Sequence, residues 1–481
     1  MVLPAPIVPL SETALIDAAA LDRGQTLADL MARAGAALAD EAELMAPEGP
    51  ILIATGPGNN GGDGWVAAEL LAERGRQVAV WPVREPRTDL AQRAAERARR
   101  SVEVIARPDV ECPALIVDCI LGAGTKGPLR AWAHDAVVAL SALGAPVLAA
   151  DAPTGIGTDT LLQPQRVLCF QLPKAELLDD ERVGEFKTVD IGIDPAATTD
   201  MQRACLQRFP MHHASGHKGQ HGELLVIAGG SFPGALSFAC RAAFICGCDL
   251  VRAWTSDGPS LPASIIVHRQ PGRWLAPAVP ELLSPLIARA SAVLIGPGLG
   301  REPGTREAAV QAFSLAMDMD VPLVVDADGI THLTPALRSV GLDGPELLIT
   351  PHRGEGRTLL GCAVEEEDIH RFAHSKRVVL LKGQHDFLSD GRHWQRNRRG
   401  NPRMAMGGTG DCLSGLAAGL LARGCTPFDA ARIASYWLNT AADELWLEQG
   451  PCYDPDAILA RLPQVLKHEL EAIDRWPPLA E

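Results

Sequence analysis

One local pattern recurs along most of the sequence: a short aliphatic run, a glycine-rich turn, and then an Ala/Leu-rich amphipathic stretch. Ile51–Ala54, for example, leads into the turn GPGNNGGDG, and Trp65–Glu73 then has the pattern of a helix. Short buried strands that alternate with helices predict a parallel sheet covered by helices. Ligands of such sheets bind at the carboxyl ends of the strands, which is where these turns lie.

The pattern occurs in two blocks. The first has strand-like runs at Ile51–Ala54, Gln77–Val80, Leu115–Val117 and Val147–Ala149, preceded by a helix at Ala28–Leu44. The second has them at Leu224–Ala228, Ala292–Ile295, Leu323–Val325, Leu347–Ile349 and Val378–Leu381. Between them, 195–220 lacks any period and is rich in His, Pro, Gly and Ser. We therefore expect two three-layer α/β/α domains, 1–205 and 206–481.

Charge and composition limit the partners. The 44 basic and 59 acidic residues give a net charge of −15, which disfavours non-specific binding to nucleic acid or to an anionic membrane. No apolar run reaches the roughly 18 residues of a membrane span, and the N-terminus lacks a basic leader, so we expect a cytoplasmic protein. Eleven scattered cysteines without a CxxC pair predict reduced thiols. We also expect a homo-oligomer.

The segment GPGNNGGDG at 56–64 is the sharpest local signal in the first block. Its glycines let the backbone turn tightly before a helix N-terminus, where exposed N–H groups form an anion site. It matches neither the phosphate loop of nucleotide kinases nor the dinucleotide fingerprint GxGxxG. A bare tight turn is the alternative.

Two further strand ends carry an aspartate followed by a glycine loop: VDCILGAGTKGPLR at 117–130 and AADAPTGIGTDT at 149–160. A carboxylate there is costly to bury unless it is paired, bound to a cation or used in acid–base chemistry. Asn60, Asp118 and Thr154 offer oxygen ligands for a hard cation. Each aspartate, taken alone, could instead cap a helix.

These three motifs, in this order, resemble the YjeF N-terminal family over about residues 10–200. That resemblance implies an epimerase of hydrated NADH and NADPH, called NAD(P)HX, with potassium held by Asn60, Asp118 and Thr154. It implies Asp151 as the proton carrier at the hydrated ring, with Lys126 as a second candidate. The substrate-binding residues carried over by motif are Asn59, Asn60, Gly61, Gly62, Asp63, Gly122, Ala123, Gly124, Thr125, Lys126, Gly127, Pro128 and Asp151.

In the second block, GGTGD at 407–411 precedes the helix-like stretch Cys412–Ala422. Backbone N–H groups at that helix N-terminus can neutralise charge on a transferring phosphoryl group, and Asp411 can take a proton from an attacking hydroxyl. A helix cap is the alternative. Six companion motifs strengthen the signal: HKGQHG at 217–222, AGGSFPGA at 228–235, IGPGLG at 295–300, DADG at 326–329, TPHRGE at 350–355 and LKGQHD at 381–386.

This block resembles the ribokinase-like family and, within it, the ADP-dependent NAD(P)HX dehydratases, which implies ADP with Mg²⁺ and Asp411 as base. Ala235, Gly298 and His352 would contact NAD(P)HX together with Asp411. The nucleotide would contact Lys382, Gly383, Gln384, His385, Asp386, Gly407, Gly408, Thr409 and Gly410. Glu355 is a candidate carboxylate on the magnesium side or, equally, a helix-capping acid.

The two resemblances together predict a repair enzyme. Its first domain interconverts the R and S epimers of NAD(P)HX, and its second dehydrates the S epimer with ADP, giving NAD(P)H, AMP and phosphate. The rival interpretation is a kinase of small vitamin-like or sugar-like molecules with an accessory N-terminal binding or scaffold domain.

Overall fold

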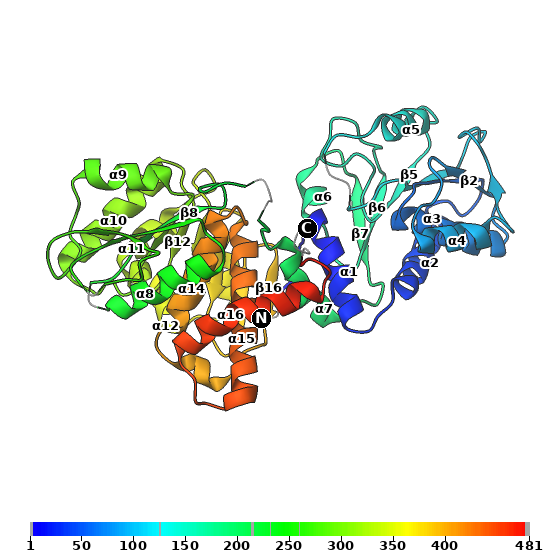
Figure 1. Ribbon diagram of the computed structural model, residues 1–481. Helices are drawn as coiled ribbons and strands as arrows, with labels where there is room; N and C mark the ends of the chain where they lie inside the picture. The colour runs from blue at the N-terminus through cyan, green and yellow to red at the C-terminus, as the bar shows by residue number, and fades with distance from the viewer. Residues whose placement is uncertain (1–2, 125–126, 213–215, 231, 259, 477–481) are drawn as a thin grey trace. The chain divides into compact units, whose positions relative to one another are not determined.

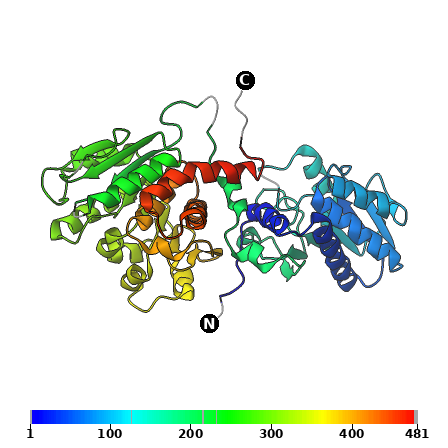
Figure 2. The same cartoon turned by 60° about the horizontal axis from the view of Figure 1, so that its bottom comes forward.

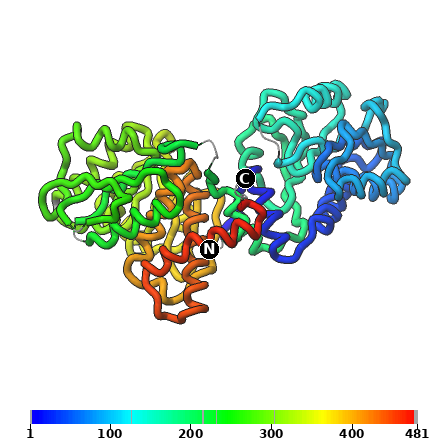
Figure 3. The backbone as a smooth tube through the Cα atoms, viewed as in Figure 1, coloured from blue at the N-terminus to red at the C-terminus, as the bar shows by residue number. Residues whose placement is uncertain are grey.

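The computed structural model describes residues 3–124, 127–212, 216–230, 232–258 and 260–476 (Figure 1). The chain forms two compact units, Pro4–Thr198 and a second unit of residues 199–476 with Leu3. The tube in Figure 3 follows the first unit from blue to cyan and the second from green to red. Each unit is described below by itself.

The first unit is built on a seven-stranded sheet with the order β3-β2-β1-β4-β5-β6-β7, in which neighbouring strands run parallel. The strands are β1 Ile51–Thr55, β2 Val78–Pro82, β3 Glu103–Val104, β4 Leu115–Cys119, β5 Val147–Ala150, β6 Arg166–Phe170 and β7 Glu185–Val189. The strand order reverses between β1 and β4, where Ala54 is in register with Asp118. A crevice at the carboxyl ends of strands is expected at such a reversal.

Helices cover both faces of this sheet (Figure 1). One core joins α2, α3 and α4 to strand residues such as Ile53 and Val117, and the other joins α5 to Leu52 and Ile116. The helical elements are η1 Leu10–Glu12, α1 Thr13–Asp22, α2 Leu27–Met45, α3 Asn59–Glu73, α4 Asp89–Ala98, α5 Ala131–Ser141, α6 Ala175–Asp179 and α7 Pro195–Thr199.

The second unit has a nine-stranded sheet with the order β10-β9-β8-β11-β12-β13-β14-β15-β16, parallel except at β15, which is antiparallel to both neighbours. The strands are β8 Glu223–Ile227, β9 Leu250–Thr255, β10 Ile266–Arg269, β11 Ala292–Ile295, β12 Leu323–Val325, β13 Leu347–Ile349, β14 Arg377–Leu381, β15 Asp386–Ser389 and β16 Trp394–Asn397. The order reverses between β8 and β11, so a ligand crevice is expected at their carboxyl ends.

Two cores again flank the sheet, one with α8, α14, α15 and α16 and one with α9, α10 and α11. Figure 2 shows α16, in red, alongside α8. The helical elements are η2 Arg203–Arg208, α8 Pro233–Ile245, α9 Pro280–Arg289, α10 Pro303–Asp318, α11 Asp328–Ser339, α12 Arg353–Leu360, α13 Glu366–Phe372, η3 Pro402–Ala405, α14 Thr409–Ala422, α15 Pro427–Gln449 and α16 Pro455–Glu471.

Helices α8 and α14 approach each other backbone to backbone. A Cβ atom on Gly415 of α14 would lie 2.3 Å from the carbonyl oxygen of Ala239 on α8, closer than any real side chain. The absence of a side chain at position 415 therefore sets the spacing of these two helices.

The expected fold class, two α/β/α domains, is confirmed, but one helix boundary is wrong. Helix α3 begins at Asn59, well before the expected Trp65, so the glycines at 61, 62 and 64 lie inside the helix. They serve a close approach: a Cβ atom on Gly61 would lie 2.1 Å from the carbonyl oxygen of Gly56. The glycines thus let the start of α3 sit tightly against the end of β1.

All eleven cysteines lie in the described part of the chain and are free thiols, eight of them buried. Among the residues that the structure describes, no helix combines the length and the apolar character needed to cross a membrane.

Candidate active sites

Three polar side chains converge where the strand order of the first sheet reverses. Asp118, at the end of β4, accepts hydrogen bonds from Thr154, at 2.7 Å from the backbone nitrogen and 2.7 Å from the hydroxyl, and from the Ile120 nitrogen at 3.1 Å. Asn60, in the first turn of α3, lies against the same loop, because a Cβ atom on Gly122 would be 3.1 Å from its Cγ. The structure therefore brings together the three residues expected to hold potassium.

The donor set of this cluster suits a monovalent cation. Both side-chain polar atoms of Asn60 are buried without a hydrogen-bond partner, an arrangement that is costly unless a ligand satisfies them. Burial raises the pKa of Asp118 to about 6, although the hydrogen bonds from Thr154 and Ile120 oppose that rise. A cation beside Asp118 would favour its charged form, and one carboxylate with neutral oxygens suits potassium better than magnesium.

A cavity of about 550 Å³ opens beside this cluster. Its volume lies within the range of small-molecule sites. It is lined by Leu10, Leu121, Gly122, Gly127, Pro128, Leu129, His134, Pro153, Gly155, Ile156, Gly157, Thr158, Asp159 and Thr160. The expected glycine loop therefore does border a cavity, whereas Leu10 and His134 carried no signal in the sequence.

Asp151 follows β5 and is buried, with φ of 61° in the left-handed region. Its carboxylate accepts hydrogen bonds at 2.6 Å from the ammonium of Lys174 and at 3.1 Å from the Phe170 nitrogen. Burial and then the Asp151 and Asp17 carboxylates raise the pKa of the buried Asp63 well above its usual range. Asp63 and Asp151, both expected at the site, thus share one buried cluster with Asp17 and Lys174, which were not expected.

The other substrate-binding residues expected in the first unit lie less centrally in this candidate site. Asn59 is exposed and accepts a hydrogen bond from the Thr88 hydroxyl at 2.8 Å. Gly61 and Gly62 are buried in the first turn of α3. Gly122, Ala123 and Gly124 lie at the end of β4, while Thr125 and Lys126 fall outside the described residues. Lys126 stays a prediction as second proton carrier.

The second candidate site centres on Asp411, in the first turn of α14 directly after the glycine loop 407–410. The ammonium of Lys382, at the end of β14, donates a hydrogen bond to the Asp326 carboxylate at 2.6 Å. A Cβ atom on Gly410 would lie 3.4 Å from that ammonium, so Lys382 lies beside the glycine loop. Asp326, from the DADG motif, had no assigned role in the sequence interpretation, and its pairing with Lys382 could not be read from spacing.

Burial and then the Asp326 carboxylate raise the pKa of Asp411 to about 7, although Lys382 opposes this. A carboxyl group that ionises near neutral pH is well suited to act as a general base there. Burial alone would lower the pKa of Lys382, but the Asp326 and Glu355 carboxylates outweigh it and raise that pKa. Lys382 therefore stays a cation beside Asp411.

His352 and Glu355 form a reciprocal cap on α12. The His352 Nδ1 accepts hydrogen bonds from the backbone nitrogens of Gly354 at 2.9 Å and Glu355 at 3.1 Å, and the Glu355 carboxylate accepts one from the His352 nitrogen at 2.9 Å. Glu355 thus caps the helix through one of its carboxylate oxygens. Burial is the main cause that raises the pKa of Glu355; Asp326 adds to the rise and Lys382 opposes it. The exposed His352 Nε2 still faces Glu355 at 3.4 Å.

Asp386 is buried, whereas the preceding residues Gly383, Gln384 and His385 are exposed. Its carboxylate accepts hydrogen bonds from the Ser435 hydroxyl at 2.7 Å and the Gly383 nitrogen at 3.2 Å. These hydrogen bonds fix the turn after Lys382, and they would have to break before the Asp386 carboxylate could contact a nucleotide.

The structure also brings Ala235 and Gly298 together: a Cβ atom on Gly298 would lie 3.0 Å from the Ala235 Cβ. In the glycine loop, Gly407 is exposed and Thr409 is buried.

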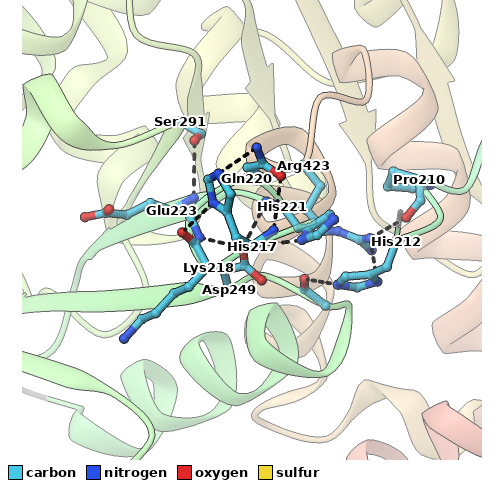
Figure 4. Close-up of polar contacts among 12 residues, drawn as sticks. Pro210, His212, His217, Lys218, Gln220, His221, Glu223, Asp249, Ser291 and Arg423 are labelled. Carbon is cyan, nitrogen blue, oxygen red and sulfur yellow. Dashed lines mark hydrogen bonds and ion pairs between the residues drawn. The ribbon is translucent and has the colours of Figure 1, made fainter. Parts of the chain in front are cut away.

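A separate cluster of His212, His221 and Asp249 has its ligand atoms within 4.8 Å of one another (Figure 4). Both ring nitrogens of His212 are already engaged, one 3.2 Å from the Gly247 carbonyl and the other 3.2 Å from the Arg423 guanidinium. A metal ion would have to displace that cation. Asp249 instead accepts hydrogen bonds from the Gly219 and His221 nitrogens, which holds the HKGQHG loop.

Comparison with known proteins agrees with the two-unit division. The family model of NAD(P)H-hydrate dehydratase matches residues 224–464, and that of the YjeF-related protein N-terminus matches residues 27–175. A ribokinase-like superfamily protein of Enterococcus faecalis covers 56% of this chain and 96% of its own with a TM-score of 0.50 at 23% identity, which supports the fold. The second unit therefore has a ribokinase-like fold, and the first matches the YjeF-related N-terminal domain.

Two curated relatives span nearly the whole chain. The bifunctional NAD(P)H-hydrate repair enzyme of Hyperthermus butylicus is 32% identical over 97% of this chain and 93% of its own. That of Pyrobaculum aerophilum is 33% identical over 91% and 93%. The chain belongs to the family of bifunctional NAD(P)H-hydrate repair enzymes, which decides against the rival interpretation as a small-molecule kinase.

Proposed function

We propose that the first unit epimerises the R and S forms of hydrated NADH and NADPH, and that the second dehydrates the S form with ADP. The observation that carries this proposal is the placement of Asp411, a carboxyl group with a pKa of about 7, in the first turn of α14 beside the half-buried cation Lys382. In this mechanism Asp411 takes the proton of the substrate hydroxyl as its oxygen attacks the β-phosphorus of ADP. The bond from that phosphorus to the bridging oxygen breaks, and AMP leaves.

The phosphorylated intermediate then loses phosphate. Its C–O bond breaks, the adjacent ring carbon gives up a proton, and the double bond of NAD(P)H is restored. Backbone N–H groups at the start of α14 and the Lys382 ammonium support the charge on the phosphoryl group. Magnesium, which would neutralise the phosphates of ADP, has candidate oxygen ligands in the Glu355 and Asp326 carboxylates.

In the first unit we propose that Asn60, Asp118 and Thr154 hold potassium and that the loop 122–128 binds the substrate. Asp151 would exchange protons with the hydroxyl or the water that leaves and returns at the hydrated carbon. The unpartnered Oδ1 of Asn60, which a cation can satisfy, and the adjoining cavity support this assignment. Potassium would fix the start of α3 relative to the loops after β4 and β5. A cytoplasmic location and a homo-oligomeric state remain predictions, to be tested by cell fractionation and light scattering.

The direct test uses mixed epimers of NADH hydrate with ADP, ATP or neither, and follows the absorbance of NADH. We expect full recovery of NADH from both epimers with ADP. A phosphorylated product that accumulates without NADH would contradict the proposed dehydration.

Dividing the chain between its two units should separate the two activities. Each unit has its own sheet and its own two cores, so each should fold by itself. Residues 4–198 alone should epimerise, and residues 199–481 alone should convert only the S epimer. A cut at 205 would instead remove Met201 and Cys205 from the core in which they are buried. Chiral chromatography of the unconverted hydrate checks this, after correction for spontaneous epimerisation. Complete and equally rapid conversion of both epimers by the second fragment would contradict it.

The pH dependence of dehydration tests the base. Because Asp411 acts in its ionised form, kcat/KM should rise with pH and level off above about pH 7. Asp326 is a like charge that raises this pKa, so Asp326→Asn should move the rise to lower pH. The same substitution leaves Lys382 without its 2.6 Å partner, so KM for ADP is measured alongside. A rise that stays in place in Asp326→Asn would rule out the electrostatic coupling.

A further inference from the structure

Lys174 forms a buried ion pair in the first unit that neither the motifs nor the proposed potassium site accounts for. Its side chain is 3% exposed and that of Asp151 is 8% exposed. The ammonium donates hydrogen bonds to the Asp151 carboxylate at 2.6 Å and to the Phe170 carbonyl at 2.7 Å. An unpaired buried ammonium would be strongly disfavoured, so Lys174 should keep its ion pair with Asp151.

The two partners come from neighbouring strand ends. Asp151 directly follows β5, and Lys174 lies between β6 and α6, where it is the N-cap of that helix. The backbone around Lys174 is fixed by Val8, which accepts a hydrogen bond from the Ala175 nitrogen at 2.9 Å and donates one to the Pro173 carbonyl at 3.0 Å. The ammonium is therefore a fixed group, and it determines where the Asp151 carboxylate points.

The other ionisable groups around this pair are mostly acidic. Asp17 on α1 and Asp63 on α3 both interact electrostatically with Asp151, as does the Cys169 thiol on β6. Burial and then Asp151 raise the pKa of Asp17 to about 6, while Lys174 opposes that rise. Lys174 is thus the cation that offsets the negative charge of this cluster. Without it, the buried Asp151 carboxylate would lie beside the Asp17 and Asp63 carboxyl groups and lose the ammonium 2.6 Å away.

We propose that Lys174 is a positioning residue of the epimerase site, which keeps the Asp151 carboxylate ionised and oriented for proton transfer at the hydrated ring. This proposal rests on the proposed epimerase function. It assigns to Lys174 no contact with the substrate: the lysine acts through Asp151, and the proton passes between Asp151 and the substrate oxygen.

The test uses the full-length chain with purified R epimer of NADH hydrate and measures kcat and KM for epimerisation across pH. Lys174→Met should lower kcat at least about tenfold with little change in KM, because the acid–base group is misplaced. The acid limb of its pH profile should move to higher pH, since the carboxylate loses the cation that favours its charged form. Lys174→Arg keeps the charge and should restore the position of that limb.

Lys174→Arg also keeps the proposal testable if Lys174→Met fails to fold. The guanidinium keeps the positive charge but cannot reproduce the 2.6 Å contact of the ammonium with Asp151, so kcat should fall while the acid limb keeps the parental position. Lys187→Met is the matched control, because Lys187 pairs with Glu41 in the same unit and its side chain is 53% exposed. Its profile should equal that of the parent.

The outcomes separate the two proposals. A parent protein that does not epimerise the hydrate overturns the proposed function. An active parent whose Lys174→Met variant keeps the parental kcat and pH profile overturns only the role of Lys174. So does an acid limb that moves to higher pH in Lys174→Arg, which keeps the positive charge.

Discussion

Replacing Asp411 with asparagine is expected to lower the rate of ADP-dependent dehydration by about 10²–10⁴-fold, the usual loss when a general base is removed. Asparagine keeps the size of the side chain, so the start of α14 should stay intact. Asp411 lies in the first turn of that helix, with a pKa near 7 set by burial and by Asp326. Epimerisation in the first unit should be unchanged. Recovery of NADH from the S epimer with ADP gives the rate.

Asp456→Asn provides the control for Asp411→Asn. Asp456 lies in the first turn of α16 in the same unit, pairs with Arg241, and its side chain is 58% exposed. Its removal should leave dehydration at the parental rate. If Asp411→Asn also dehydrates at that rate, Asp411 is a helix-terminal acid and the proton of the substrate hydroxyl goes elsewhere.

Replacing Asp118 with alanine is expected to lower epimerisation about 10²-fold while dehydration continues. The substitution removes the one carboxylate of the proposed potassium site and the acceptor of three hydrogen bonds from Thr154 and Ile120. The loops after β4 and β5 should then lose their mutual alignment, and a misplacement of about 1 Å can cost that much in rate. The measurement is interconversion of purified epimers in potassium and in sodium buffer.

Two further variants separate the ion from the hydrogen bonds. Asp118→Asn keeps the shape of the side chain but loses its charge, so it should need far more potassium than the parent for the same rate. Asp135→Ala, on α5 with a side chain that is 81% exposed, should match the parent in both buffers. Equal epimerisation by the parent in sodium and potassium, together with an active Asp118→Ala, would remove the ion from the mechanism.

The strands were predictable because their aliphatic runs are buried on both faces. The expected strands Ala292–Ile295, Leu323–Val325 and Leu347–Ile349 agree with β11, β12 and β13 residue for residue. Helix α3 was misplaced because its first turn contains glycines that local propensity assigns to a loop. Those glycines allow close contacts with other segments: Gly61 with Gly56, Gly62 with Met31 and Gly64 with Cys119. Helix propensity describes single residues and contains no information on such contacts.

In the candidate sites, too, residues marked by local motifs were predictable, and residues whose role depends on a distant partner were not. Motifs pointed to Asp118, Asp151 and Asp411: the first two follow an apolar run and precede a glycine loop, and Asp411 follows a glycine loop and precedes an apolar helix. They did not identify Lys174 or the role of Asp326, because each depends on a partner from another strand. Spacing along the chain likewise could not show that the Asp386 carboxylate turns inward to Ser435.

The contact of α8 with α14 has a consequence for how this domain could change its substrate. Asp411 lies in the first turn of α14 and Ala235 in the first turn of α8. The backbone contact at Gly415 sets the separation of the two helices. Any side chain at position 415, one turn beyond Asp411, would force them apart and displace the base from the substrate. The separation of the Asp411 and Ala235 positions is therefore set by the packing of the two helices. A substrate of another size would have to be accommodated by the loops around them and not by a shift of either helix.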